Sequence, residues 1–170
     1  CVIGDGNPAF IIAEMSANHG QDINKAIEII YAAKESGADA VKLQTYTADT
    51  LTLNHKSADF YIYKGPWKGR YMYDLYKSAY TPWEWHAELQ DVAKKNGISL
   101  FSSPFDSTAV DFLNDLDIPA YKIASPEIID LPLIRKVAQT NKPIIMSTGS
   151  ATLGQINEAI EFIDIGGPSL

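Results

Sequence analysis

Short apolar runs alternate with helical patterns along the chain. An apolar run of about four residues predicts a buried strand, whereas apolar residues spaced three and four apart predict a helix. Such runs predict strands at Ala9–Ala13, Ala40–Leu43, Ser99–Ser102, Ala120–Ile123 and Ile144–Ser147. The helical spacing predicts helices at Ile23–Ser36, about 82–96, Thr108–Leu116, Leu131–Thr140 and Leu153–Ile163. Each strand is thus followed by a helix, which is typical of a parallel sheet.

Capping residues indicate where several of these helices begin. Asp22 and Asp130 each directly precede a helix pattern and are expected to cap it. Thr152 with Gln155 predicts a capping box, in which each side chain bonds the other residue's backbone N–H. The segment Thr81-Pro82-Trp83-Glu84 predicts a further capping box, with proline at the first helical position.

Five strand–helix units predict an α/β fold that forms part of a (β/α)8 TIM barrel. The chain lacks the glycine fingerprint of a dinucleotide-binding fold, so the barrel is favoured. In either fold, ligands bind at the carboxyl ends of the strands. One long connection, at about 45–80, interrupts the alternation. It is rich in Tyr, Lys, Asp and Gly and contains a predicted short helix at Tyr71–Ser78. A connection of this length is typical of a functional lid or of a disordered loop.

Composition narrows the classes of partner and compartment. The net charge is −7 and no run of Lys or Arg occurs, which argues against nucleic acid as the main partner. No apolar stretch is long enough to cross a membrane. A single cysteine, Cys1, excludes an internal disulfide and fits a reducing compartment. Because the chain starts without methionine and stops where another strand is due, we expect residues 1–170 to be a fragment of a longer protein.

Charged and amide side chains lie in or directly after the apolar strands. Lys42 and Gln44 flank Leu43, so the period of two places both on the face away from the covering helix. Lys122 repeats this arrangement between Tyr121 and Ile123. A lysine in a buried strand is costly unless an anion pairs with it. The two lysines therefore predict a phosphate or carboxylate site, the alternative being side chains that extend to the surface.

Carboxylates and hydroxyls occupy the same strand ends. Glu14 ends the first strand and is a candidate acid, base or sugar-hydroxyl acceptor, or else a solvated or ion-paired glutamate. Asn18 and His19 could orient a ligand or form a capped turn. Hydroxyls follow the later strands, where free backbone N–H groups can bind phosphate or where a hydroxyl can simply cap a helix. They are Ser102, Ser103, Ser125, Ser147 and Thr148. His19, His55 and His86 show no spacing typical of a metal site.

Several of these segments resemble the sialic acid (nonulosonic acid) synthase family. The similar blocks are Phe10–His19, Ala38–Thr45, Phe101–Phe105, Pro119–Ser125 and Lys142–Gly149. Within the family, Gly65–Gly69, Tyr73–Tyr76 and Thr81–His86 resemble pseudaminic acid synthases more than N-acetylneuraminate synthases. The resemblance implies a (β/α)8 barrel that condenses phosphoenolpyruvate with an acetamido sugar, here 2,4-diacetamido-2,4,6-trideoxy-altrose, to give pseudaminic acid and phosphate.

The resemblance also implies roles for individual residues. Gln44 and Asn18 would contact the sugar, and Glu14 and Glu127 are the acid and base candidates. The phosphoenolpyruvate would be held by Lys42, Ser103, Lys122, Ser125 and Ser147. A divalent Mn²⁺ or Mg²⁺ would assist, bound by two family histidines that we expect beyond residue 170. The last barrel strands and a C-terminal antifreeze-like domain, which contributes sugar contacts across a homodimer, are expected there too.

One departure and several alternatives remain at this point. The family often has Met where this chain has Ser150, a change expected to be harmless. The isolated chain, without the metal site, is expected to be inactive. The alternatives are a synthase that acts on N-acetylmannosamine or on the legionaminic acid precursor, a Schiff-base aldolase that uses Lys42 or Lys122, and a non-catalytic binding module. The synthase reading implies a cytoplasmic enzyme with no membrane or nucleic-acid partner.

Overall fold

The computed structural model describes residues 3–166, in which five parallel strands form one sheet in the order β1-β2-β3-β4-β5. The strands are β1 (Ile12–Glu14), β2 (Ala40–Thr45), β3 (Ser99–Pro104), β4 (Tyr121–Ile123) and β5 (Ile144–Met146). The main helices are α1 (Ile23–Glu35), α4 (His86–Lys95), α5 (Ser107–Asp115), α6 (Leu131–Ala138) and α7 (Leu153–Gly166). Sequential order of strands, each followed by a helix, confirms five units of a (β/α)8 barrel.

The first strand begins later than the sequence predicted. Pairing with β2 starts at Ile12 opposite Ala40, so β1 covers Ile12–Glu14 and the predicted strand Ala9–Ala13 is shifted. At Ile11 the backbone N–H donates to the Asp39 carboxylate at 2.7 Å, so it bonds a side chain and not the backbone of β2. The shift places Glu14 within the strand and opposite Lys42 in the register.

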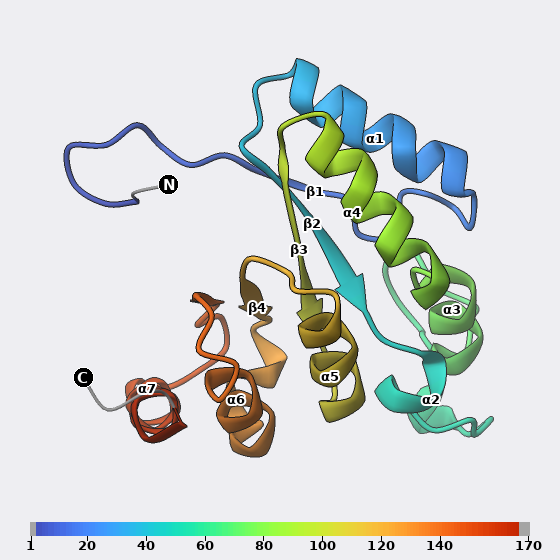
Figure 1. Ribbon diagram of the computed structural model, residues 1–170. Coiled ribbons are helices and arrows are strands. Elements are labelled where there is room, and N and C mark those ends of the chain that lie inside the picture. Colours follow the sequence, from blue (N-terminus) through green and yellow to red (C-terminus); the bar gives the residue numbers. More distant parts are fainter. Residues whose placement is uncertain (1–2, 167–170) are drawn as a thin grey trace.

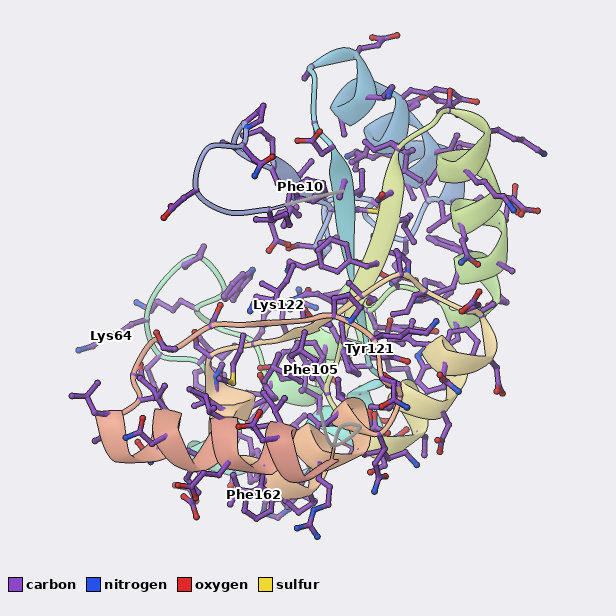
Figure 2. The ribbon with its side chains drawn as sticks, turned by 60° about the vertical axis from the view of Figure 1, so that its left-hand side comes forward. Phe10, Lys64, Phe105, Tyr121, Lys122 and Phe162 are labelled. Atoms are coloured by element: carbon purple, nitrogen blue, oxygen red, sulfur yellow. The ribbon has the colours of Figure 1, made fainter. Side chains whose placement is uncertain are left out.

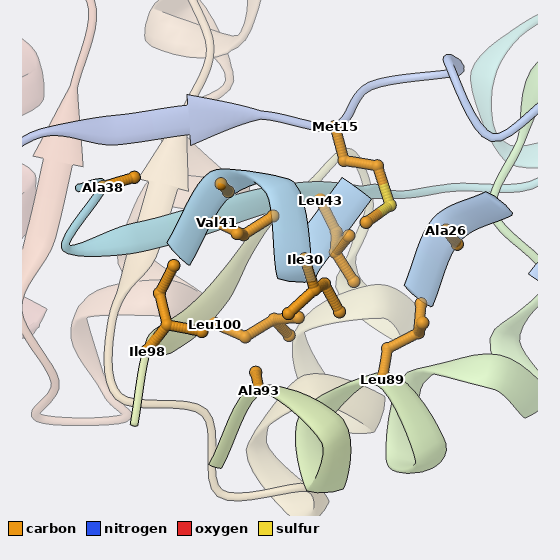
Figure 3. Close-up of a cluster of buried hydrophobic side chains, with 11 residues drawn as sticks. Met15, Ala26, Ile30, Ala38, Val41, Leu43, Leu89, Ala93, Ile98 and Leu100 are labelled. Carbon is orange, nitrogen blue, oxygen red and sulfur yellow. The ribbon is translucent and has the colours of Figure 1, made fainter. Parts of the chain in front are cut away.

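Two apolar clusters hold the helices on the outer face of the sheet. The alternation of β2 directs Val41 and Leu43, both fully buried, toward Ile30 of α1 and Leu89 of α4 (Figure 3). A second cluster joins β4 to α5, α6 and α7 through Ile123 and other buried side chains. Figure 1 shows α1 and α4 lying along β2 and β3, with α5, α6 and α7 following around the sheet. Lys42 and Gln44 consequently belong to the opposite, inner face, as predicted.

The long connection after β2 folds against the carboxyl ends of the strands. It contains α2 (Ala48–Leu51), a 3-10 turn at Ala58–Phe60 and α3 (Met72–Ala79), close to the predicted Tyr71–Ser78. Buried Tyr46 contacts Tyr76 of α3 and Phe105 after β3, with ring centres 5.9 and 5.5 Å apart. These contacts fix the connection to β2 and β3, whereas its Trp67 remains exposed.

Three of the four predicted helix caps are present in the structure. Asp22 accepts from the N–H of Asn24, Asp130 accepts from the N–H of Leu133, and Thr152 forms the capping box with Gln155. The capping box predicted at Thr81 is wrong. A 3-10 turn at Trp83–Trp85 precedes α4, and the Thr81 hydroxyl bonds His19 instead.

The packing predicts that truncating a side chain in the cluster between β2, α1 and α4 will cost much more stability than truncating one at the surface. Leu43→Ala should lower the free energy of unfolding by about 2–5 kcal/mol, because it leaves a cavity between β2 and α1. Leu53→Ala, at a residue that is 68% exposed, should change it by less than about 0.5 kcal/mol. Urea unfolding followed by tryptophan fluorescence measures both, and equal effects would contradict the packing.

Candidate active site

Lys42 is a buried cation that is paired with a carboxylate. Its residue is 8% exposed, and Nζ lies 2.5 Å from Oε1 of Glu14 on the neighbouring strand. Glu14 is half exposed and is also contacted by the Ser16 hydroxyl at 3.4 Å. The interpretation of Glu14 as an ion-paired residue therefore holds in this state. The Glu14 carboxylate offsets the cost of burying the Lys42 ammonium. Because Glu14 is half exposed, an incoming anion could displace it from Lys42.

Lys122 lies two strands further along the sheet and binds neutral oxygens. Nζ donates to the Ser147 hydroxyl and to the carbonyl of Ile123, both at 2.6 Å. These partners come from the ends of β4 and β5, so the ammonium bridges two neighbouring strands. Figure 2 shows Lys122 toward the interior, whereas Lys64 of the long connection extends outward. Neutral oxygens orient the ammonium without neutralising it, so a net positive charge remains for an anion.

Both lysines belong to one electrostatic group. Burial, and after it the positive charge of Lys42, lowers the pKa of Lys122, while Glu14 and Glu127 act in the opposite direction. The side chains are therefore close enough for their charges to interact, although β3 separates their strands. Two like charges on one inner face repel each other, and an anion between them would relieve that repulsion.

Glu127 is a carboxyl group that is poorly compensated. It lies in the 3-10 turn Pro126–Ile129 after β4, and its Oε2 is buried with no hydrogen-bond partner among the described residues. Burial raises the pKa of Glu127, and the nearby negative charge of Asp130 adds to this, while Lys122 lowers it. A raised pKa favours the protonated form and makes Glu127 a candidate proton donor.

The serine hydroxyls differ in how they are held. Ser103 is buried, and its Oγ has no partner within the described part of the chain. Ser147 already accepts from Lys122. Ser125 lies under the loop after β5, because a Cβ added to Gly149 would come within 2.9 Å of its Oγ. A buried hydroxyl without a partner normally costs free energy, so Ser103 is a candidate for a hydroxyl that bonds a ligand.

The loop after β1 does not place both predicted residues at the site. Asn18 is exposed there, and among the described residues no hydrogen bond joins its side chain to Lys42 or Lys122. His19 is fully buried: its Nδ1 accepts from the N–H of Gln21, and its Nε2 bonds the Thr81 hydroxyl at 3.2 Å. Burial lowers the pKa of His19, consistent with a neutral ring. For His19 the structure supports the turn-forming alternative.

Three buried polar residues near the site were not predicted as a group. Thr45, Ser102 and His86 form a hydrogen-bonded chain behind the ends of β2 and β3. Each lies in an apolar pattern, so only the alternation of strand residues could have hinted that the two hydroxyls point toward α4.

The metal implied by the resemblance finds no ligand set in residues 3–166. No three His, Cys, Asp or Glu side chains gather there closely enough to hold an ion. His19 and His86 are both engaged in buried hydrogen bonds. The described residues therefore do not fit a Mn²⁺ or Mg²⁺ site, and histidines beyond residue 170 stay a prediction.

A hollow elsewhere on the surface is not part of this site. It has a volume of about 450 Å³ and lies between α4 and the start of β3, where Gln90, Lys94 and Ser99 line it. This is the amino-terminal side of the sheet, which in such barrels serves stability rather than chemistry.

Among the described helices, none is long and apolar enough to cross a bilayer.

Comparison with known proteins gives a consistent result. The family model described as "NeuB family" matches residues 29–169. The chain is 54% identical over 153 residues to the pseudaminic acid synthase of Helicobacter pylori, which covers 90% of this chain and 45% of that protein. It is 38% identical over 160 residues to the N,N'-diacetyllegionaminic acid synthase of Legionella pneumophila, covering 94% and 45% respectively. The chain thus spans about half the length of these relatives.

A solved structure supports the fold. The N-acetylneuraminic acid synthetase of Leptospira borgpetersenii, crystallised with citrate, matches with a TM-score of 0.82 and 26% identity. The match covers 99% of this chain and 56% of that one. The predicted α/β barrel fragment is therefore confirmed both by its own topology and by similarity.

The close approach of Gly149 to Ser125 predicts a steric test of the site. Gly149→Ala should destabilise the protein by about 1–3 kcal/mol, because the new methyl meets the Ser125 hydroxyl. Adding Ser125→Ala should recover part of the loss. Gly154→Ala is the control, since its nearest atom, Thr152 Oγ1, is 3.8 Å away. Thermal unfolding compares the variants, and a harmless Gly149→Ala would contradict the geometry.

The lowered pKa of Lys122 predicts how anion binding depends on pH. Sulfate remains a dianion from pH 7 to 10, so only the protein titrates. Its affinity should fall as the pH rises, beginning below the usual lysine range, because Lys122 loses its proton early. Lys122→Met should bind sulfate more weakly at pH 7 and lose this step. Calorimetric titration measures both, and an unchanged pH profile in the variant would contradict the assignment.

Proposed function

The chain belongs to the NeuB family, and on this premise we propose that it is the amino-terminal part of a synthase that condenses phosphoenolpyruvate with an acetamido sugar. The observation that carries the proposal is the pair of lysines on one inner face, buried Lys42 and partly buried Lys122. The Ser147 hydroxyl contacts Lys122, and the buried hydroxyl of Ser103 lies on β3 between them. In phosphoenolpyruvate the carboxyl carbon and the phosphorus are three bonds apart, and its two anionic groups match two cations with flanking hydroxyl donors.

The residues present suit the charge flow of this condensation. C3 of phosphoenolpyruvate attacks the sugar aldehyde, water adds to the C2 cation, and the tetrahedral intermediate loses phosphate by cleavage of the C–O bond. In this scheme Lys42 and Lys122, with Ser103, Ser125 and Ser147, anchor the anionic groups and stabilise the leaving phosphate. Glu127, with its raised pKa, would donate a proton to the forming hydroxyl. Glu14 would release Lys42 to the substrate and then accept the proton lost by the water that adds to C2.

The sugar we propose is 2,4-diacetamido-2,4,6-trideoxy-altrose, which gives pseudaminic acid. The support is the higher identity to a pseudaminic acid synthase, 54%, than to a legionaminic acid synthase, 38%. Gln44, half-buried opposite Ser103 in the register, would contact the sugar, and Asn18 would have to move toward it. The alternatives remain N-acetylmannosamine and the legionaminic acid precursor.

The remaining parts of such a synthase are also proposals. The relatives are about twice as long as this chain, which leaves room for the last barrel strands and an antifreeze-like domain. We place there the histidines that would hold Mn²⁺ or Mg²⁺, whose chemistry would be to polarise the aldehyde oxygen. A homodimer in the cytoplasm completes the proposal.

A Schiff-base aldolase is a second candidate because of one observation. Burial lowers the pKa of Lys122, and a lysine that loses its proton easily is a better nucleophile. Borohydride reduction in the presence of the substrates separates the two reactions. A covalent adduct on Lys122 indicates the aldolase, and no adduct indicates the synthase.

Phosphate release by the full-length protein tests the proposed function. With phosphoenolpyruvate, Mn²⁺ and each of the three sugars, we expect release with the altrose derivative only. Lys122→Met should lower kcat/KM by about 100-fold or more, as expected for loss of a charged contact to a reacting phosphate. Lys64→Met, which removes an outward-facing lysine, is the matched control and should leave activity unchanged.

Each outcome decides a different part of the proposal. Release with N-acetylmannosamine would retain the mechanism and contradict the choice of sugar. No release with any of the three would contradict the synthase function, and equal activity of the two lysine variants would contradict the site.

A further inference from the structure

A chain of three buried polar groups runs behind the site. His86 Nε2 lies 2.8 Å from the Thr45 hydroxyl, which lies 2.6 Å from the Ser102 hydroxyl. At the other end, His86 Nδ1 lies 3.2 Å from the carbonyl of Pro82. All three side chains are at most 1% exposed, so water cannot replace any of these bonds.

The chemistry of the ends fixes the direction of every hydrogen bond. A carbonyl only accepts, so His86 Nδ1 carries the proton and donates to Pro82. Burial lowers the pKa of His86 to about 4, so near neutral pH the ring is uncharged and Nε2 accepts. Thr45 therefore donates its one hydroxyl proton to His86, and Ser102 must donate to Thr45. Every hydrogen bond along this row of three side chains then has one possible direction.

The hydrogen-bonded residues Thr45, Ser102 and His86 lie directly behind two proposed substrate contacts. Thr45 follows Gln44 in β2, and Ser102 precedes Ser103 in β3, while Gln44 and Ser103 face each other in the register. Because side chains alternate along a strand, hydroxyls fixed toward α4 direct Gln44 and Ser103 to the inner face. A displacement of either hydroxyl would move the neighbouring contact.

The hydrogen bonds of His86 also join both ends of the long connection, because His86 bonds Thr45 at one end and Pro82 at the other. Thr45 lies at the point where this segment leaves β2, and Pro82 where it returns to α4. A second bond closes the same gap, because Trp83 Nε1 donates to the carbonyl of Tyr46 at 3.2 Å. Phe112 of α5 holds the group from the side, stacked on Trp83 and edge-on to His86, with ring centres 4.7 and 5.2 Å away.

We propose that His86, Thr45 and Ser102 are positioning residues, which act through the backbone of β2 and β3 to hold Gln44 and Ser103 for the sugar and for phosphoenolpyruvate. This inference rests on the proposed function for the identity of the substrates. The physical basis of the inference does not depend on the proposed function, because the hydrogen bonds, their directions and their place behind Gln44 and Ser103 follow from the geometry.

The test compares variants of the full-length protein that differ in single hydroxyl groups. Thr45→Val keeps the shape of the side chain but removes the hydroxyl, whereas Thr45→Ser keeps the hydroxyl. Ser102→Ala is a milder variant, because Thr45 can still donate to His86. We expect Thr45→Val to raise KM for both substrates about threefold to tenfold with kcat changed less than about twofold, Ser102→Ala to have a smaller effect, and Thr45→Ser to resemble the parent.

Amide hydrogen exchange provides a second readout that needs no activity. Residues 44–47 and 102–105 should exchange faster in Thr45→Val than in Thr45→Ser. A role confined to stability would lower the active fraction, so a fall in kcat at constant KM would overturn the proposal, as would equal exchange in the two variants. If the parent releases no phosphate, the proposed function fails, while the exchange comparison still decides the positioning role.

Discussion

The constraint on which the site depends is the presence of two lysines on the inner face of one parallel sheet. Each ammonium is oriented, Lys42 by the carboxylate of Glu14 and Lys122 by Ser147 and a backbone carbonyl, but together they carry more positive charge than the one carboxylate in contact offsets. Burial makes this arrangement costly and also makes an incoming anion bind strongly, because little water competes. An anion that binds between the two ammonium groups would offset their mutual repulsion.

The strands separate this chemistry from the packing that supports it. In β2, Val41 and Leu43 are buried in the apolar cluster with α1 and α4, while Lys42 and Gln44 occupy the other face. At the carboxyl end the outer face changes from apolar to polar, and Thr45 and Ser102 form a satisfied chain with His86. A buried polar chain of this kind is more demanding than an apolar contact, because each member fits one partner in one direction. It therefore specifies the position of the strand ends where side-chain contacts to a ligand would be made.

Much of this could be predicted from the sequence, and the remainder has identifiable causes. Alternation within β2 is local, so it correctly placed Lys42 and Gln44 away from the helices. The Glu14–Lys42 pair and the Ser102–Thr45–His86 chain join residues 28 to 57 positions apart, and they depend on strand register, which no local pattern states. The Thr81 capping box was wrong because His19 competes for its hydroxyl. Asn18 was expected at the site from its place after the first strand and from the resemblance, but neither states how the loop turns, and Asn18 lies exposed there.

A crystal structure of the full-length protein with phosphoenolpyruvate bound tests the central claim most directly. The account predicts the phosphate and carboxylate within hydrogen-bond distance of Lys42 and Lys122, with the free hydroxyl of Ser103 donating to one of them and Glu14 displaced from Lys42. Phosphoenolpyruvate bound elsewhere, or bound on this face with the Glu14–Lys42 pair intact and Lys122 without contact to it, would contradict the account.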